Sequence, residues 1–329
     1  MFFVLYLFVS VVIVFTAIKL AKYTGLLEKK TKVSGALLGG VLLASVTSLP
    51  ELFASLSAVV LFNDPLLSMG NILGSNIFNL GFMALFLVFA LGAFSKSKMS
   101  KANIAYFLFV LGIYLVLFLG VFVDINIQIP FISISIITIA ILIIYSSGVY
   151  KISKMPIEEN LLSEPDTSPL SAKQVVVRFI IACVVLVAAS VGLTFASTEI
   201  EKILNLGAGL AGAVLIGCTT SIPEITATLA LIKKRNFNMA VSNIIGSNLF
   251  NLIIICVCDI FYFKGTVYSG LQNDSQIKYL IYFGLFSTVT GLILVLLSRR
   301  INNKVIYFSL LLLIVLSYLG FLIFSSIYL

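Results

Sequence analysis

The sequence predicts an all-α membrane protein in which ten transmembrane helices form two inverted repeats of five. Hydrophobic residues make up 60% of the 329 positions and charged residues only 10%, and the mean hydropathy is +1.17. A soluble domain carries charge on about a quarter of its positions. Apolar runs of about 20 residues, long enough to cross a hydrocarbon core as a helix, recur along the whole chain.

The apolar runs between charged or turn-rich breaks give the boundaries of the ten helices. These are 2–20, 33–62, 66–93, 102–123, 129–149, 175–198, 206–232, 239–263, 277–298 and 304–328. The first run has neither a basic leading segment nor a small-residue cleavage site, so we expect a retained helix rather than a signal peptide.

A polar linker divides the helices into two groups. Residues 150–174 contain three prolines and four acidic residues, a composition typical of an irregular connection. We therefore predict a first five-helix unit at 1–149, a linker at 150–174 and a second five-helix unit at 175–329.

Lysine and arginine fall almost entirely on one side of this topology. Eighteen of the 21 lie in or beside the odd-numbered loops, and the exceptions are Lys202, Lys264 and Lys278. The positive-inside rule then makes the odd loops and the linker cytoplasmic and both termini extracytoplasmic, in the plasma membrane. Because each half has an odd number of helices, the second half enters the membrane with the opposite polarity. Inverted repeats of this kind occur in many secondary transporters, whose substrate sites lie near the midplane.

Composition also excludes several kinds of site. The chain has no histidine, so a histidine metal site or proton relay is impossible. No nucleotide motif is present, and the net charge of +8 follows the predicted topology rather than a nucleic-acid surface. We expect no cofactor and no obligate protein partner. The cysteines have no zinc or redox spacing and are interpreted as small buried hydrophobic residues, namely Cys183, Cys218, Cys256 and Cys258.

One short motif occurs once in each half, inside an apolar run. The first copy is Thr47-Ser48-Leu49-Pro50-Glu51 and the second is Thr220-Ser221-Ile222-Pro223-Glu224. A Gly-Ser-Asn-x-Phe-Asn motif follows each copy and ends 28 positions after Glu51, at Asn79, and 27 positions after Glu224, at Asn251. A glutamate at membrane depth costs a few kcal/mol or more unless it is paired, protonated or bound to a cation. Two of them at matching positions indicate a functional site.

The residues around the two glutamates are potential oxygen ligands. The proline of each motif lacks an amide hydrogen, so we expect it to kink or break its helix and to free backbone carbonyls. Carboxylates, hydroxyls and asparagine carbonyls complete an all-oxygen cage, which suits Ca²⁺ and Na⁺ and not copper or zinc. Ser75 with Asn79, and Ser247 with Asn251, are spaced i, i+4 and share a helix face.

Some of the polar residues also have a structural interpretation. Small and amide side chains hold membrane helices together, and for Asn76 and Asn248 this explanation is as good as a ligand role. Asp259 has no counterpart in the first half, and we interpret it as an interfacial or paired structural acid with Lys264 nearby.

With these motifs the chain resembles the sodium/calcium exchanger family within the cation/Ca²⁺ antiporters. The similarity covers essentially the whole chain and is sharpest in two α-repeats, residues 35–80 and 208–252. It implies that Glu51 and Glu224 carry a Ca²⁺ site, aided by the carbonyls of Thr47 and Thr220. It also implies that the first and sixth helices slide over the other eight. Further residues implied at the site are the Na⁺-binding hydroxyls of Ser48, Ser75, Ser221 and Ser247, the carbonyls of Ala44 and Gly217, and the central Asn79 and Asn251.

The chain departs from the family pattern at positions that bear on the coupling ion. Val46 and Thr219 stand where glycine is frequent, and Asn251 stands where many prokaryotic relatives have aspartate. We expect a Na⁺/Ca²⁺ antiporter that expels Ca²⁺, with Ca²⁺/H⁺ antiport or K⁺-dependent exchange as alternatives. A passive cation channel is less favoured, and so is an enzyme, because no nucleophile–base pair accompanies the acids.

Overall fold

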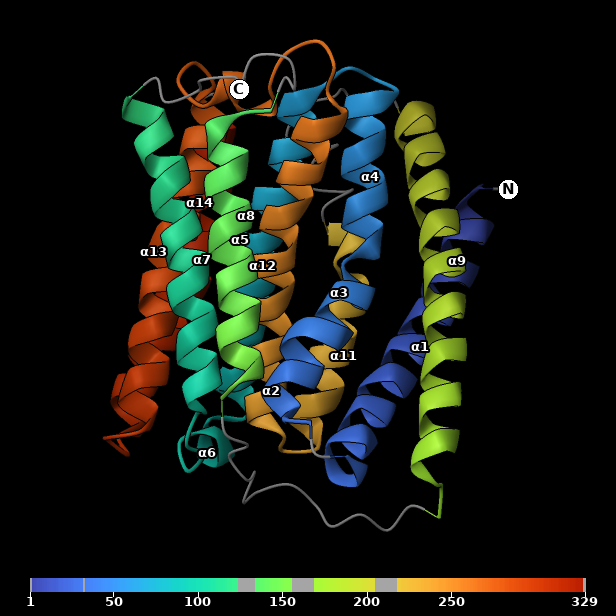
Figure 1. The fold of residues 1–329 in the computed structure, drawn as a ribbon, viewed down its shortest axis with the longest axis vertical. Coiled ribbons are helices and arrows are strands. Elements are labelled where there is room, and N and C mark those ends of the chain that lie inside the picture. The colour runs from blue at the N-terminus through green and yellow to red at the C-terminus, as the bar shows by residue number, and fades with distance from the viewer. Residues whose placement is uncertain (1, 32, 124–133, 156–168, 205–217, 328–329) are drawn as a thin grey trace.

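The protein is all-helical across the residues that the computed structural model describes, which are 2–31, 33–123, 134–155, 169–204 and 218–327 (Figure 1). The elements before residue 155 are α1 (Phe2–Lys30), α2 (Gly35–Leu37), η1 (Leu38–Leu43), α3 (Ala44–Thr47), α4 (Leu49–Val60), α5 (Pro65–Phe89), α6 (Leu91–Phe94), α7 (Lys101–Phe122) and α8 (Ile136–Ser153). Those after residue 168 are α9 (Ala172–Leu204), α11 (Ile222–Lys233), α12 (Phe237–Phe261), η2 (Val267–Gly270), α13 (Ser275–Ser298) and α14 (Lys304–Ile327).

Eight helices in the described residues are long and apolar enough to cross a membrane, which confirms a multi-helical membrane protein. A ninth span is formed if residues 35–47 and 49–60, which meet at a bend of 44°, are counted together. The expected helix at 206–232 is described only from residue 218, and the expected helix at 129–149 only from residue 134. Residues 156–168 of the predicted linker also lie outside the described part of the chain.

The first and sixth predicted spans are longer than expected. We expected α1 to end at residue 20, but it continues to Lys30, and α9 covers Ala172–Leu204 instead of 175–198. The added part of α1 keeps an apolar face buried through Leu26 and Leu27, while Lys22 is exposed. Long basic side chains can reach water from the end of a membrane helix, so charges near residue 20 do not end it.

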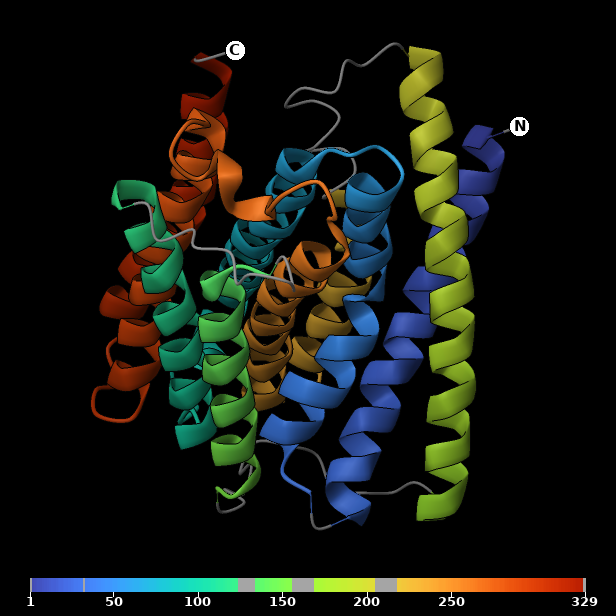
Figure 2. The same ribbon diagram turned by 45° about the horizontal axis from the view of Figure 1, so that its top comes forward.

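The helices form a bundle with α1 and α9 side by side along one flank (Figures 1 and 2). In the apolar stretch of α12, 72% of the residues are buried, against 28% in α1, so α12 belongs to the core and α1 to the periphery. The central helices α5 and α12 run in opposite directions, because α5 descends to α6 while α12 rises from the same end (Figure 1). The Gly-Ser-Asn-x-Phe-Asn motifs therefore meet in the middle of the protein.

Asp259, near the end of α12, is buried and ties three elements together. It accepts four hydrogen bonds, from Ser135 N at 3.0 Å, Thr138 Oγ1 at 2.8 Å, Thr266 Oγ1 at 2.8 Å and Val267 N at 3.2 Å. These bonds join α12 to the start of α8 and to the segment at η2. The contacts agree with a structural role for Asp259, but Lys264 is exposed and is not among its partners.

Candidate cation site

In both halves the Thr-Ser-x-Pro-Glu motif ends one helix and begins another. α3 ends at Thr47, and α4 begins at Leu49 with Pro50 in its first turn. α11 begins after the turn at Ser221 and also has its proline in the first turn. Proline fits there because the first amides of a helix have no partner within it. The predicted breaks are confirmed, and they place Glu51 and Glu224 where the positive end of a helix dipole favours a carboxylate.

A π-helix precedes the first motif and was not predicted. In η1, Gly40 packs directly against α12, so that a Cβ on Gly246 would come within 2.1 Å of the Gly40 carbonyl oxygen. Without side chains at this crossing, the backbones of η1 and α12 can approach closely. Local π-helix is frequent at functional sites, and here it ends at Leu43, one short helical segment before the first motif begins at Thr47.

The two motif glutamates are fully buried, and each is held by the opposite half of the chain. Ser221 Oγ donates a hydrogen bond of 2.9 Å to Glu51 Oε1, and Ser48 Oγ donates one of 2.7 Å to Glu224 Oε1. The two carboxylates are close enough to interact electrostatically. The second oxygen of each, Oε2, has no hydrogen-bond partner.

Four asparagines of the Gly-Ser-Asn-x-Phe-Asn motifs form a reciprocal network between α5 and α12. Asn76 Nδ2 donates to the Asn248 carbonyl at 3.2 Å, and Asn248 Nδ2 donates to the Asn76 carbonyl at 2.9 Å. Asn79 Nδ2 donates to Asn248 Oδ1 at 3.3 Å, and Asn251 Nδ2 donates to Asn76 Oδ1 at 3.0 Å. Asn76 and Asn248 therefore use both ends of their amides to join the helices, as their structural interpretation predicted, whereas Asn79 and Asn251 keep a carbonyl oxygen free.

The buried oxygens that remain without a partner include three equivalent pairs from the two motifs. They are Oε2 of Glu51 and Glu224, Oγ of Ser75 and Ser247, and Oδ1 of Asn79 and Asn251. Leaving a buried polar atom unpaired costs about 1–3 kcal/mol, so such atoms are rare without a cause. All six can act as electron-pair donors to a cation. Their chemistry, with two carboxylates among them, suits a hard cation.

The structure gives less support to a ligand role for the remaining predicted site residues. Thr47 and Thr220 are buried and lie close to Glu224 and Glu51, respectively. The Ala44 carbonyl already accepts bonds from Ser48 N at 3.0 Å and Thr47 Oγ1 at 3.2 Å, so in this conformation it is not a free ligand. Gly217 lies outside the described residues.

Two asparagines that we did not single out continue the pattern. Asn71 Nδ2 donates to Ser55 Oγ at 2.9 Å, and Asn243 Nδ2 donates to Thr228 Oγ1 at the same distance. Their Oδ1 atoms also lack partners. Each lies four residues before the serine of the second motif, and each partner hydroxyl lies four residues after the motif glutamate. Extending the repeat comparison by one helical turn would have found them.

A family profile described as sodium/calcium exchanger protein matches residues 1–151 and 174–327. The chain belongs to the sodium/calcium exchanger family. The matched ranges exclude residues 152–173, most of the predicted linker. The family resemblance of the two motifs is thereby confirmed.

Known relatives and solved structures agree with this assignment. An uncharacterised membrane protein of Methanocaldococcus jannaschii is 27% identical to this exchanger-family chain over 226 residues, 66% of this chain and 67% of that protein. Structures of the sodium-calcium exchanger NCX_Mj, soaked with Na⁺ and either Ca²⁺ or Sr²⁺, align with TM-scores of 0.67 and 0.71. The alignments cover 96% of this chain and 97% of that exchanger at 19% and 18% identity, so they show a common fold.

Proposed function

We propose that this exchanger-family protein is a secondary antiporter that exchanges Ca²⁺ for Na⁺ at a site built on Glu51 and Glu224. The observation that carries the proposal is the set of six unpartnered buried oxygens, three from each half of the chain. Ca²⁺ takes six to eight oxygen ligands in flexible geometry, and carboxylates, hydroxyls and amide carbonyls are suitable donors. Two carboxylates neutralise one Ca²⁺.

Competition for these carboxylates explains exchange. A site with both glutamates ionised and no cation has two uncompensated charges at membrane depth, which is costly. Release of Ca²⁺ is therefore coupled to the arrival of other cations at the same oxygens. Na⁺ accepts the same hydroxyl, carbonyl and carboxylate ligands, so it can replace Ca²⁺ without any change in the ligand set. The ions are substrates, and we assign the protein no catalytic activity.

Alternating access follows from the relation between the two halves. We propose that residues 1–149 and 175–329 are inverted five-helix repeats joined by the linker at 150–174, which gives ten spans in total. The opposite directions of α5 and α12 and the reciprocal bonds of Ser48 and Ser221 support this. Asn63 and Arg235 support it as well, because both have a positive φ and they lie at matching positions, two residues before α5 and α12 respectively. Sliding of α1 and α9 over the other helices would open the site to either side.

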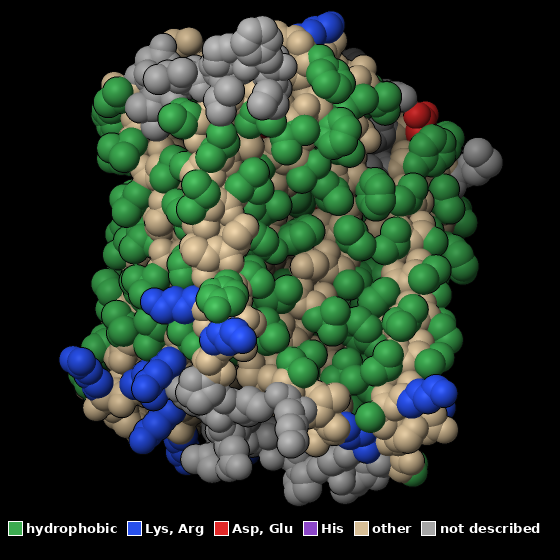
Figure 3. Space-filling view, viewed as in Figure 1, with side chains coloured by type: hydrophobic (Ala, Val, Ile, Leu, Met, Phe, Trp, Pro, Cys, Tyr) green, Lys and Arg blue, Asp and Glu red, His purple; other side chains and the backbone are tan. Residues whose placement is uncertain are grey.

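The basic side chains support an orientation for this antiporter. Lysine and arginine gather at the lower end of the face in Figure 3, the end at which α6 lies in Figure 1. By the positive-inside rule that end faces the cytoplasm, and both termini face out of the plasma membrane. Cysteines introduced separately at Ser163 and Asn273 should react with an impermeant reagent from opposite sides of intact cells. Reaction of both from outside would contradict this topology.

The coupling ion is tested by ⁴⁵Ca²⁺ uptake into proteoliposomes with one gradient imposed at a time. Vesicles loaded with Na⁺ and diluted into Na⁺-free buffer should take up ⁴⁵Ca²⁺ at fixed pH, and K⁺ or pH gradients alone should drive little uptake. Brisk uptake driven by a proton gradient and indifferent to Na⁺ would identify a Ca²⁺/H⁺ antiporter instead. Uptake that needs no opposing gradient and does not saturate would indicate a channel.

A further inference from the structure

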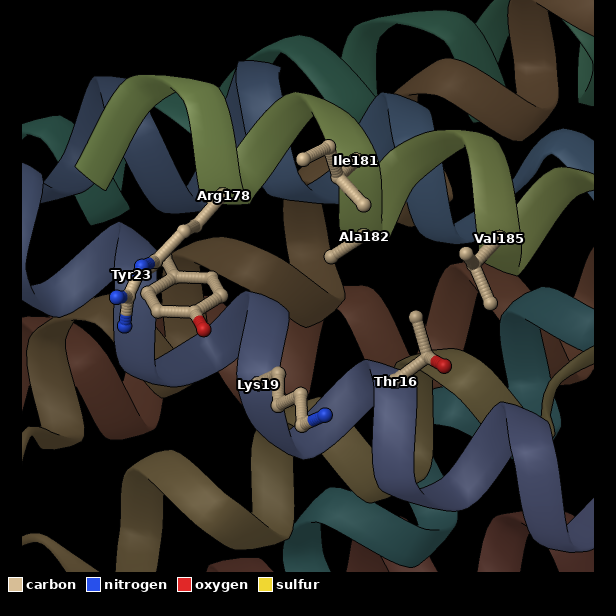
Figure 4. Close-up of a pocket in the computed structure, with 7 residues that line it drawn as sticks. All are labelled: Thr16, Lys19, Tyr23, Arg178, Ile181, Ala182 and Val185. Atoms are coloured by element: carbon tan, nitrogen blue, oxygen red, sulfur yellow. The ribbon is translucent and has the colours of Figure 1, made fainter. Parts of the chain in front are cut away.

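An open groove of about 160 Å³ lies between α1 and α9, on the flank of the bundle and separate from the cation site (Figure 4). Lys19 and Tyr23 of α1 and Arg178 of α9 form one part of its lining, and Thr16, Ile181 and Val185 form another. The groove thus has a polar part with two basic groups and a largely apolar part that runs along α9.

The basic groups of the groove are available to a ligand. Lys19 and Arg178 are exposed, and neither forms an ion pair or hydrogen bond within the described part of the chain. Lys22 of α1 and Lys173 of α9, which lie within five residues of Lys19 and Arg178 respectively, are exposed as well. Four cations on two adjacent helices therefore favour an anionic partner.

The apolar part of the groove has the character of a lipid-facing surface. Ile181 is 57% exposed and Val185 is 40% exposed, although both lie in a helix apolar enough to cross a membrane. Along α9 they follow Arg178 by about one and two helical turns. An anionic head group would therefore contact the basic side chains, and an apolar chain attached to it would contact Ile181 and Val185.

We propose that this groove binds an anionic phospholipid of the cytoplasmic leaflet. Its phosphate lies between Lys19 and Arg178, and an acyl chain lies along Ile181 and Val185. Basic pockets between transmembrane helices on the cytoplasmic side are suited to anionic lipid headgroups. The proposal rests on the orientation and the sliding helices of the proposed function. A lipid that bridges α1 and α9 would adjust their movement as a pair, and with it the rate of exchange.

Native mass spectrometry of the purified full chain can measure this binding directly. Phosphatidylglycerol should bind more tightly than phosphatidylcholine, and glycerol phosphate, which has the charge but no acyl chains, should not displace it. Each of Lys19→Gln and Arg178→Gln should weaken phosphatidylglycerol binding about fivefold, and the double variant about 30-fold. Lys304→Gln is the matched control, because it removes an exposed lysine at the start of α14, on the opposite flank.

The proposal would be overturned if the double variant bound phosphatidylglycerol with the wild-type affinity. It would also be overturned if Lys304→Gln lost as much affinity for this lipid as the double variant. The lipid measurement needs no ion gradient, so its failure is separate from a failure of Na⁺/Ca²⁺ exchange. In proteoliposomes, phosphatidylglycerol should change the ⁴⁵Ca²⁺ flux of the wild type and leave that of the double variant unchanged. Equal lipid dependence of the two fluxes would also contradict the assigned groove.

Discussion

Ser48 donates a hydrogen bond of 2.7 Å to Glu224, which lies 176 positions away in the chain. The equivalent Ser221 donates to Glu51 at 2.9 Å. The orientation of each carboxylate therefore depends on a hydroxyl from the opposite half. A displacement of either motif must disturb both glutamates, so neither half can change the surroundings of its own carboxylate alone.

Removing these hydroxyls should weaken Ca²⁺ binding without unfolding the protein. A hydrogen bond to a charged group is worth about 1.5–3 kcal/mol, so Ser48→Ala and Ser221→Ala should each raise the half-saturating Ca²⁺ concentration about tenfold or more. The effects should be similar because the two bonds are equivalent. Ser45→Ala is the control, since Ser45 Oγ donates to the Val41 carbonyl one turn earlier in the chain and not to a glutamate. A comparable loss in Ser45→Ala would show that the effect is not specific to the carboxylates.

Neutralising either glutamate should abolish transport and preserve the fold. Glu51→Gln and Glu224→Gln remove a buried charge but keep the shape of the side chain, and removing charge at membrane depth should ease insertion. ⁴⁵Ca²⁺ flux should fall to the background of empty vesicles, while size-exclusion profiles remain monodisperse. Full transport by either variant would remove that residue from the proposed site.

Asp259→Asn should lower the stability of the protein and leave its Ca²⁺ affinity unchanged. The carboxylate of Asp259 accepts four hydrogen bonds, and an amide nitrogen would face donors that it cannot satisfy. We expect a loss of about 1–3 kcal/mol in stability, seen as a lower thermal unfolding midpoint. The folded fraction should bind Ca²⁺ with unchanged affinity. Weakened Ca²⁺ binding at unchanged stability would instead give Asp259 a transport role.

Asn251→Asp should make exchange sensitive to acid. Asn251 Nδ2 donates to Asn76 Oδ1 at 3.0 Å, and an aspartate could restore that donor only when it is protonated. Low pH should therefore favour a protonated state that competes with Ca²⁺, and exchange should be inhibited at low pH more strongly than in the wild type. Asn79→Asp should behave alike, because Asn79 donates to Asn248 in the same way. Identical pH profiles for wild type and variants would contradict this.

Gly246→Ala should disrupt the crossing of η1 and α12. The added Cβ would lie 2.1 Å from a backbone oxygen, which cannot move aside as a flexible side chain could. Overpacking of this kind costs about 1–3 kcal/mol, so the unfolding midpoint and the transport rate should both fall. Gly70→Ala is a fitting control, because no described atom outside its own helix lies within 4 Å of the added Cβ. A Gly246→Ala variant as stable as the wild type would show that η1 and α12 can separate freely.

Features set by local chemistry were predictable from the sequence. Apolar runs located the membrane helices, and the proline of each motif located the helix breaks, because its missing amide acts whatever its neighbours are. The ends of α1 and α9 were misplaced, since charge alone does not show whether a lysine stands in a loop or on the exposed side of a helix.

Features that depend on contacts between the halves were not predictable. The π-helix at η1 lies where Gly40 meets Gly246, and no pattern in either segment reveals that contact. The motifs identified Ser48 and Ser221 but not that each serves the opposite glutamate. Asn76 could have been a ligand or a link between helices, and the sequence does not show which way its amide points. The reciprocal bonds to α12 show that it links the helices.

The asparagine network has an electrostatic consequence for the centre of the protein. Asn79 and Asn251 each donate an amide hydrogen to the opposite helix, and within the described residues no group donates to their side-chain carbonyl oxygens. Their dipoles thus present a negative end even while both glutamates are neutral. These uncharged groups therefore favour a cation over chloride or phosphate at this position, whether or not the carboxylates are ionised.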